Sequence, residues 1–177
     1  YILFGTMNIV DERKGFKHLL GGLTKLASEL VNKKDEIEII IFGKANEKLL
    51  DSIPFKRNYF GNFKNEEDII YCYNAADIFI APSLQDNLPN TVLESLSCGT
   101  PVVAYSVGGL PDMIDHLNNG YLAEANSVED LTNGLKWYLK NKSNVESLSL
   151  NARNKVIKNF SQKIVAGKYE ELYRSLI

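Results

Sequence analysis

The chain has 177 residues, of which 45% are hydrophobic and 24% charged; this is sufficient for one sizeable core and predicts a single domain over residues 1–177. Its formal net charge is −2, so it lacks the basic surface that nucleic-acid binding requires, and we expect no nucleic-acid partner. Its two cysteines, Cys72 and Cys98, have neither a C-x-x-C nor a histidine spacing. This argues against a disulfide framework or a zinc site and predicts two core thiols.

No apolar run approaches the ~18 residues that a membrane-spanning helix needs, and no signal peptide opens the chain. We therefore expect a soluble, cytoplasmic domain. The chain begins without methionine, in an apolar run over residues 1–4 that ends at Gly5. Such a run is typical of a buried strand in a parallel sheet, and its abrupt start predicts a part of a longer protein.

From Phe16 to Leu30, apolar residues recur at spacings of three and four, which predicts an amphipathic helix. Lys14 and Gly15 directly precede this helix. A cation at the start of a helix opposes the helix dipole unless an anion lies beside it. Lys14 is therefore either a solvated side chain or part of an anion site, and the residues alone leave both possibilities open.

β-Branched residues over 36–42 predict a central strand, residues 44–54 contain a short helical patch, and a brief strand is expected over 58–61. Asn65 is placed to cap the next helix, whose first turn is acidic. The buried face of that helix is predicted to carry Ile69, Ile70 and Tyr73.

Residues 77–109 hold the most informative pattern in the chain. The segment predicts, in order, a buried strand over 78–81, a polar loop over 82–90, a helix over 91–98 that stops at Gly99, and a second buried strand over 102–105. In a strand, helix, strand unit the loop faces the ligand-binding edge of the sheet. A ligand site is therefore expected at this loop.

The start of the helix in this unit is suited to an anion. Pro89 fits the first helical position, where its missing N–H costs nothing. The next three amides then have no intrahelical acceptor, and together with the helix dipole they attract an anion such as a phosphate. These are the amides of Asn90, Thr91 and Val92.

Two carboxylates, Asp86 and Glu94, flank this helix start with seven residues between them. They are too far apart for one helical face but close enough to bracket one ligand. A carboxylate beside an anion site suggests sugar hydroxyls as its partners. Taken singly, Asp86 could equally turn the loop and Glu94 could equally be a solvated helix residue.

After this unit, a short helix over 111–114, a turn over 118–120 and a strand over 121–123 are expected, and Ser127 is placed to cap a further helix. Two more helices should cover 145–160 and 161 to the end. His18 and His116 have no spaced partner, so we interpret both as structural. The alternation of strands and helices predicts an α/β fold with a doubly wound parallel sheet.

The ordered pattern of Asp86, Glu94, the run G-T-P-V-V-A over 99–104 and the glycines at 108–109 resembles the donor-site signature of group 1 glycosyltransferases, the retaining family 4 with the GT-B fold. The first acidic position is usually Glu in that family, and an aromatic residue and Gly usually follow it. Here Asp86 is followed by Leu and Pro at 88–89, which we interpret as a subfamily mark.

The resemblance covers nearly the whole chain and implies a Rossmann-like carboxyl-terminal half of a GT-B enzyme. It implies a UDP- or GDP-sugar donor, transfer to a saccharide or lipid-linked acceptor with retention of configuration, and an acceptor-binding amino-terminal domain outside these residues. The last helix, over 161–177, should cross toward that domain. No Asp-x-Asp occurs, so no metal and no cofactor are expected. Binding of the full-length enzyme to the inner face of the membrane stays open.

By the same resemblance, the catalytic set is Lys14, Asp86 and Glu94. Lys14 should reach the donor diphosphate, Glu94 the ribose hydroxyls, and Asp86 the hydroxyls of the transferred sugar, with Asn87 and Leu88 beside it. These assignments favour the anion-site interpretation of Lys14 over the solvated one.

The family usually has an arginine about six residues before this lysine, where the chain has Asn8, and Arg13 is the only arginine nearby. Arg13 is therefore a candidate phosphate ligand beside Asn90, Thr91 and Val92. Phe63, in the loop that the resemblance places near the base, is a candidate base contact, although packing is the commoner role of such an aromatic.

Two other functions compete with this interpretation. A Rossmann oxidoreductase is disfavoured because no G-x-G-x-x-G follows the first strand. A catalytically inactive nucleotide-binding or protein-interaction module of the same fold stays as an alternative, favoured by the missing arginine at the position of Asn8.

Overall fold

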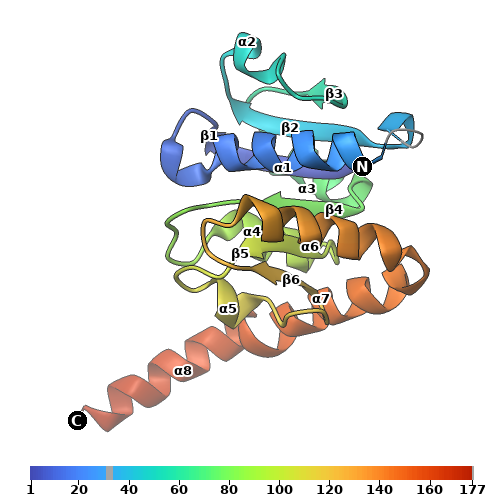
Figure 1. The fold of residues 1–177 in the computed structure, drawn as a ribbon. Helices are drawn as coiled ribbons and strands as arrows, with labels where there is room; N and C mark the ends of the chain where they lie inside the picture. The colour runs from blue at the N-terminus through green and yellow to red at the C-terminus, as the bar shows by residue number, and fades with distance from the viewer. Residues whose placement is uncertain (31–33, 177) are drawn as a thin grey trace.

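The structure is a computed structural model that describes residues 1–30 and 34–176. It contains one six-stranded sheet in which every pairing is parallel, with the order β3-β2-β1-β4-β5-β6 (Figure 1). The strands are β1 Ile2–Asn8, β2 Glu38–Lys44, β3 Lys56–Tyr59, β4 Ile78–Ala81, β5 Val102–Tyr105 and β6 Gly120–Ala123. The predicted doubly wound α/β fold is confirmed.

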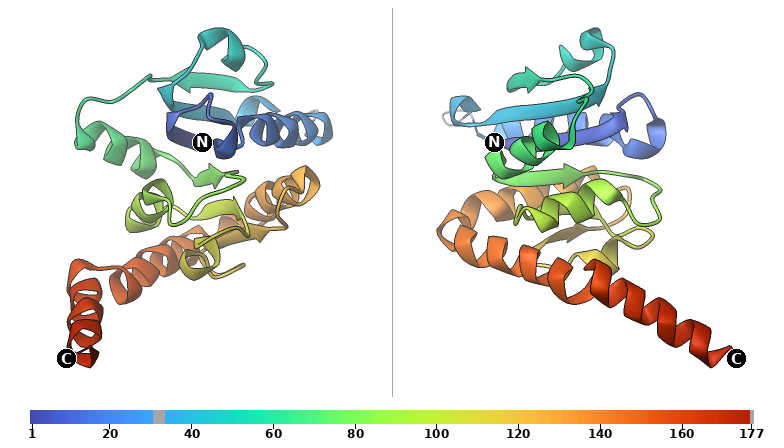
Figure 2. Two further views of the ribbon diagram at one scale, coloured as in Figure 1. Left: turned by 90° about the vertical axis from the view of Figure 1, so that its left-hand side faces the viewer. Right: turned by 180° about the vertical axis from the view of Figure 1, so that it is seen from behind.

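Helices cover both faces of this sheet. Figure 2 shows α1 and α6 together on one face and α3, α4 and α7 on the other. The helices are α1 Phe16–Glu29, α2 Glu47–Leu50, α3 Glu66–Ala75, α4 Asn90–Ser97, α5 Leu110–Met113, α6 Val128–Lys140, α7 Val145–Asn159 and α8 Gln162–Ser175. Short 3₁₀ turns occur at Glu12–Lys14, Lys34–Glu36 and Lys142–Asn144.

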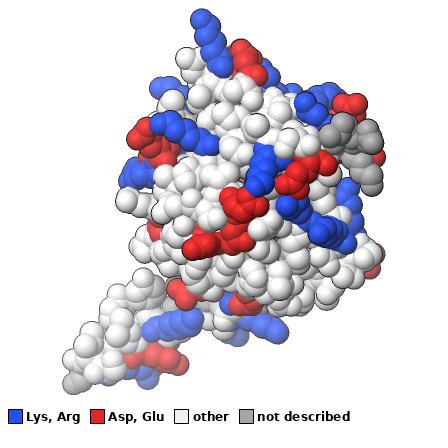
Figure 3. All heavy atoms as spheres, in the orientation of Figure 1, with Lys and Arg blue, Asp and Glu red and all other residues white. Residues whose placement is uncertain are grey.

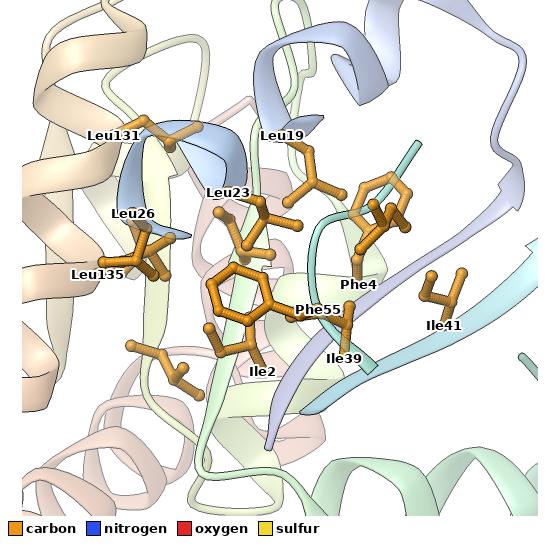
Figure 4. Packing of buried hydrophobic residues seen from close by; sticks show 14 of the residues in the cluster. Ile2, Phe4, Leu19, Leu23, Leu26, Ile39, Ile41, Phe55, Leu131 and Leu135 are labelled. Carbon is orange, nitrogen blue, oxygen red and sulfur yellow. The ribbon is translucent and has the colours of Figure 1, made fainter. Parts of the chain in front are cut away.

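The sheet is buried on both faces, because successive strand residues point to opposite sides. In β1, Phe4 packs in the cluster that includes Leu23 of α1 and Ile39 of β2 (Figure 4). Leu3, one residue earlier, points to the other side and packs with Ile40 and the residues of α4. This explains why the strands read as continuous apolar runs and not as alternating ones.

The order of the strands creates a crevice at one edge of the sheet. β1 and β4 are neighbours, but the chain leaves β1 toward β2 and leaves β4 toward β5. The loops that follow these two strands, over residues 9–15 and 82–89, therefore lie next to each other at the carboxyl edge, where hydrogen bonds join them. Ligands of doubly wound sheets bind at such a switch point.

Several local predictions need correction. Pro89 is the N-cap of α4 with ψ of 122°, so the helix begins one residue after it and ends at Ser97. Tyr73 is buried and Ile69 packs against the core as predicted, but Ile70 is 47% exposed, and Cys72 is buried in its place. The strand expected over 58–61 occurs two residues earlier, as β3. Cys72 is buried as predicted, whereas Cys98 is only half-buried.

Other predictions are confirmed. The Asn65 side chain accepts a hydrogen bond from the amide of Asp68, and the Ser127 side chain accepts one from Asp130, so both act as N-caps. His116 is exposed in a turn, where its ring accepts from the amide of Leu122.

The last helix, α8, differs from all the others. It extends away from the body of the domain (Figures 1 and 2), and none of its residues is buried. It exposes apolar surface, because Tyr169, Leu172 and Tyr173 are all more than half exposed. Residue 177, at the end of the predicted helix, lies outside the described residues.

Candidate functional site

The turn after β1 and the loop after β4 are locked together at the crevice. Gly15 has φ of 72°, and a Cβ there would lie 1.9 Å from the carbonyl oxygen of Pro82. Only glycine allows this approach. Next to it, the amide of Leu84 donates to the carbonyl of Arg13 at 2.7 Å. The backbone thus holds the side chains of these two segments against each other.

The result is an ion pair between two predicted site residues. Lys14 Nζ donates to Asp86 Oδ2 at 2.8 Å, and the two side chains are 31% and 14% exposed. The residues are 72 positions apart in the chain. In the described structure, the predicted phosphate ligand and the predicted sugar ligand therefore satisfy each other.

Glu94 has a partner that the sequence analysis missed. Its carboxylate accepts a hydrogen bond from the hydroxyl of Tyr73 at 3.0 Å. Tyr73 is fully buried between α3 and the sheet. Burial, and then the neighbouring Glu94 carboxylate, raises the pKa of the Tyr73 phenol, so it stays a donor. Tyr73 orients Glu94, which itself remains exposed at the surface of α4.

The start of α4 offers fewer amides than predicted. The amide of Val92 donates to the carbonyl of Pro89 at 3.1 Å, so it is used within the first turn. Asn90 and Thr91 are the first two helical residues, and their amides precede the first intrahelical bond. These two amides, with the helix dipole, are what the helix presents to an anion.

A cleft of about 540 Å³ and another of about 630 Å³ meet at the Lys14–Asp86 pair, since both residues line both clefts. The larger one places Lys14, Asp86 and Glu94 around one volume. It is also lined by other predicted site residues, namely Leu88, Asn90, Thr91 and Phe63. Residues that local sequence patterns did not indicate complete it: Thr6, Met7, Phe42, Gly43, Asn62, Ile69 and Pro89.

Phe63 lines the same cleft as the ion pair. Its ring is 5.6 Å from that of Phe42 and 5.9 Å from that of Phe60, measured between centroids. Phe63 is half-buried, so it packs on its neighbours and still lines the cleft. This position is compatible both with packing and with contact to a nucleotide base.

The smaller cleft contains the remaining predicted residues, Arg13 and Asn87. Arg13 is paired with Asp11 at 2.7 Å, and its side chain is 68% exposed. The hydrogen bond from Arg13 holds the pKa of the Asp11 carboxyl below its usual range. Arg13 thus lines the smaller cleft, and its positive charge is already paired with Asp11.

The two glycines at 108–109 support the loop that carries Asp86. Gly108 has φ of 52°, and a Cβ there would lie 1.8 Å from the carbonyl oxygen of Asp86. The amide of Gly109 donates to the carbonyl of Asn87 at 2.6 Å. The loop carbonyl therefore occupies this amide, which is not available to an anion.

The charged side chains at the two clefts form individual ion pairs, Lys14 with Asp86 and Arg13 with Asp11. On the face drawn in Figure 3, acidic and basic side chains are intermixed.

Within residues 1–30 and 34–176, no three His, Cys, Asp or Glu side chains are arranged to hold a metal ion. Among the helices of the same residues, none is long and apolar enough to cross a membrane.

Comparison with known proteins identifies the family. The sequence model of the glycosyl transferases group 1 matches residues 2–155. The chain is 28% identical over 110 residues to the UDP-Gal:alpha-D-GlcNAc-diphosphoundecaprenol alpha-1,3-galactosyltransferase of Escherichia coli, an alignment that covers 62% of this chain and 28% of that protein.

Solved structures share the fold. The TM-score is 0.81 with Anabaena HepE crystallised with UDP, at 17% identity, covering 99% of this chain and 49% of that one. It is 0.75 with the carboxyl-terminal domain of a group 1 glycosyl transferase from Francisella tularensis, at 17% identity, covering 92% and 87%. The alignments with the first curated relatives cover only 36%, 28% and 30% of their lengths.

Proposed function

The chain belongs to the glycosyl transferases group 1, and from this membership we propose that it is the donor-binding half of a retaining, family 4 enzyme. The proposed reaction transfers a sugar from a UDP- or GDP-sugar to a saccharide or lipid-linked acceptor. The observation that carries the proposal is the one cleft that Lys14, Asp86, Glu94 and the start of α4 share.

The phosphate end of the donor is assigned to Lys14 and to the amides of Asn90 and Thr91. As the anomeric bond breaks, negative charge develops on the departing diphosphate and positive charge spreads over the sugar ring. A preorganised donor aimed at such a charge contributes about 2.7–4 kcal/mol. Loss of Lys14 should therefore slow turnover of the full-length enzyme by roughly a hundredfold or more.

The hydroxyl-rich parts of the donor are assigned to the two carboxylates. Glu94, oriented by Tyr73, accepts hydrogen bonds from the ribose. Asp86 accepts from the transferred sugar, with Asn87 lining the smaller cleft and Leu88 the larger one. Phe63, which lines the same cleft, is assigned to the base. UDP in the Anabaena structure supports a nucleotide in this place.

We further propose that the reaction needs no metal and no cofactor, since Lys14 and helix amides supply the charge stabilisation. The acceptor site belongs to an amino-terminal domain, toward which α8 extends, and the full-length protein acts in the cytoplasm. The diphosphoundecaprenol in the name of the Escherichia coli relative favours work at the inner face of the membrane.

One observation favours the alternative, a nucleotide-binding module without chemistry. Asn8 occupies the position where the family usually has an arginine, and Arg13 is engaged by Asp11. If neither residue contributes a second cation, Lys14 alone must stabilise the leaving group. Binding without transfer would then be the outcome.

Calorimetric titration of the chain with UDP, GDP, ADP and their sugar conjugates tests the donor site. We expect one nucleotide to bind selectively, and Lys14→Ala and Glu94→Ala each to weaken it. Glu129→Ala is a matched control, because Glu129 lies in the first turn of α6 and lines neither cleft. Binding that is insensitive to both site variants would overturn the assignment.

Transfer is then measured with the full-length protein and the preferred donor, with and without Lys14→Ala. Sugar transfer lost in the variant supports the enzyme. Tight donor binding without transfer by the unaltered full-length protein selects the inactive module.

A further inference from the structure

Glu94 lies at an exposed position of α4, so its direction depends on the contacts that its side chain makes. An exposed glutamate has several rotamers of similar energy, and holding it in one of them costs conformational entropy. The hydroxyl of Tyr73 donates to Glu94 Oε2 at 3.0 Å and so selects one direction of the carboxylate. How precisely Glu94 is aimed therefore depends on how rigidly Tyr73 is held.

The ring of Tyr73 packs edge-on against two other aromatic rings. Its centroid lies 5.6 Å from that of Phe79 and 5.9 Å from that of Phe42, with interplanar angles of 78° and 86°. Such edge-to-face contacts are favourable and restrict rotation of the ring. Phe42 also lines the candidate donor cleft, so the ring of Tyr73 is fixed to a wall of that cleft.

The main chain of Tyr73 is held by a buried hydroxyl from another part of the chain. Tyr73 lies in the last turn of α3, where helix carbonyls lack their usual intrahelical partners. Thr100 Oγ1 donates to the carbonyl of Tyr73 at 2.7 Å, and the amide of Ala76 donates to the same oxygen at 3.2 Å. Thr100 is 3% exposed. Its hydroxyl thus links the segment before β5 to the end of α3.

Thr100 is fixed in turn to α4 through Ser95. Ser95 Oγ donates to the carbonyl of Thr100 at 2.9 Å, and the amide of Thr100 donates to the carbonyl of Ser95 at 2.9 Å. Ser95 is fully buried and directly follows Glu94 in the helix. The contacts therefore form a closed ring, which runs from Glu94 to Tyr73, to Thr100, to Ser95 and back to Glu94 through the backbone of α4.

We propose that Thr100 is a positioning residue, which holds Tyr73 so that Glu94 is aimed at the donor ribose and ribose is selected over 2′-deoxyribose. This inference rests on the proposed function, in which Glu94 binds the ribose. Thr100 lines neither candidate cleft, so it acts through Tyr73 and not by contact with the nucleotide. The closed ring restrains Glu94 because a shift of one member must be followed by the others.

A purely structural role for the Thr100 hydroxyl makes a different prediction. If the hydroxyl only satisfied a buried carbonyl, its loss would lower stability and leave nucleotide selection unchanged. Thr132 is the matched control for this role. It is fully buried, its hydroxyl donates to the carbonyl of Val128 at 2.8 Å within α6, and it lines neither cleft.

Calorimetry with UDP, 2′-deoxy-UDP, GDP and 2′-deoxy-GDP measures the preference for ribose as a ratio of dissociation constants. For the nucleotide that the unaltered chain binds more tightly, the ratio should be roughly tenfold or more, because Glu94 accepts a charge-assisted hydrogen bond from the ribose. Thr100→Val should lower the ratio at least about threefold. Thr100→Ser, which keeps the hydroxyl, should restore it, and Thr132→Val should leave it unchanged.

A double variant tests whether Thr100 acts through Tyr73. Tyr73→Phe removes the hydroxyl that contacts Glu94, so adding Thr100→Val to it should lower the preference for ribose no further. Two residues that acted independently would instead lower the preference by the product of their single effects.

The outcomes separate this inference from the proposed function. A ribose preference that Thr100→Val leaves intact, an equal loss in Thr132→Val, or independent effects in the double variant would each overturn the positioning role and leave the function standing. If the unaltered chain does not prefer ribose, or if Glu94→Ala keeps the preference, the assignment of Glu94 to the ribose fails, and the positioning role fails with it.

Discussion

Replacing Asp86 by Asn should strengthen the binding of a nucleoside diphosphate while weakening the binding of the corresponding nucleotide sugar. In the described structure, Lys14 donates to Asp86 at 2.8 Å, so a diphosphate must compete with this carboxylate for the lysine. Asn keeps the size of the side chain but removes the charge. The proposed phosphate ligand, Lys14, then loses this carboxylate partner, and the proposed sugar ligand, residue 86, is impaired.

The two effects can be sized from the geometry. The pair is neither fully exposed nor fully buried, with exposures of 31% and 14%, so we take about 1 kcal/mol for its loss, at the upper end of exposed pairs. UDP should then bind about fivefold tighter. A charge-assisted hydrogen bond to a sugar hydroxyl contributes about 1.5–3 kcal/mol. The preference for UDP-sugar over UDP should therefore fall by roughly 10- to 150-fold.

Calorimetry with UDP, GDP and their sugar conjugates measures both quantities on the same variant. Asp77→Asn controls for net charge, because Asp77 lines neither cleft. In a Lys14→Ala background the gain for the diphosphate should vanish, since the two residues act through one contact. Weaker diphosphate binding by Asp86→Asn, or a gain that persists without Lys14, would refute the competition.

Three further outcomes are expected. Gly108→Ala should lower the free energy of unfolding in urea by at least about 2 kcal/mol, because φ is 52° and the new Cβ would meet a loop carbonyl. Gly61→Ala is the control, since Gly61 has φ of 66° but open space around it, and it should lower the free energy of unfolding by only about 1 kcal/mol. Equal losses of stability in the two variants would contradict the contact at Gly108. Tyr73→Phe should weaken nucleotide binding about fivefold, because Glu94 loses the hydroxyl that orients it. An unchanged affinity would show that Tyr73 does not contribute to nucleotide binding. Burial alone would raise the pKa of Asp130, but hydrogen bonds from a backbone amide, a tyrosine hydroxyl and an asparagine outweigh it and lower the pKa below 3.8. At pH 7 the Asp130→Asn variant should therefore have a lower free energy of unfolding than the unaltered chain, and this difference should shrink as the pH falls below 3.8. A difference in unfolding free energy that does not change with pH would show that the carboxylate charge is not involved.

Local sequence rules predict the elements of this fold well where one signal dominates. The strands β4 and β5 occur at the residues expected, because each is a short apolar run with polar or glycine boundaries. The caps Asn65 and Ser127 act as predicted, since an N-cap depends only on residues within the next turn. Ile70 was assigned wrongly because helical periodicity gives a face but not its width.

The contacts that define the site could not be predicted in this way. Lys14 and Asp86 meet across 72 positions only because β1 and β4 are adjacent in the sheet, and strand order is not a local property. Tyr73 reaches Glu94 because α3 and α4 cover the same face. The family signature named the two carboxylates and the lysine, but it did not indicate how each is held.

The electrostatics of the free cleft imply an order of recognition. Lys14 is matched by Asp86 and Arg13 by Asp11, so the unpaired attraction for an anion comes from the amides at the start of α4. A diphosphate that binds there and takes over Lys14 leaves Asp86 without its cation, and sugar hydroxyls then satisfy that carboxylate. A free sugar cannot displace Lys14, because a neutral hydroxyl is a weaker partner for a carboxylate than an ammonium group. Under the proposed assignment, sugar recognition at Asp86 therefore depends on prior occupation of the phosphate position, and we expect the site to select activated sugars.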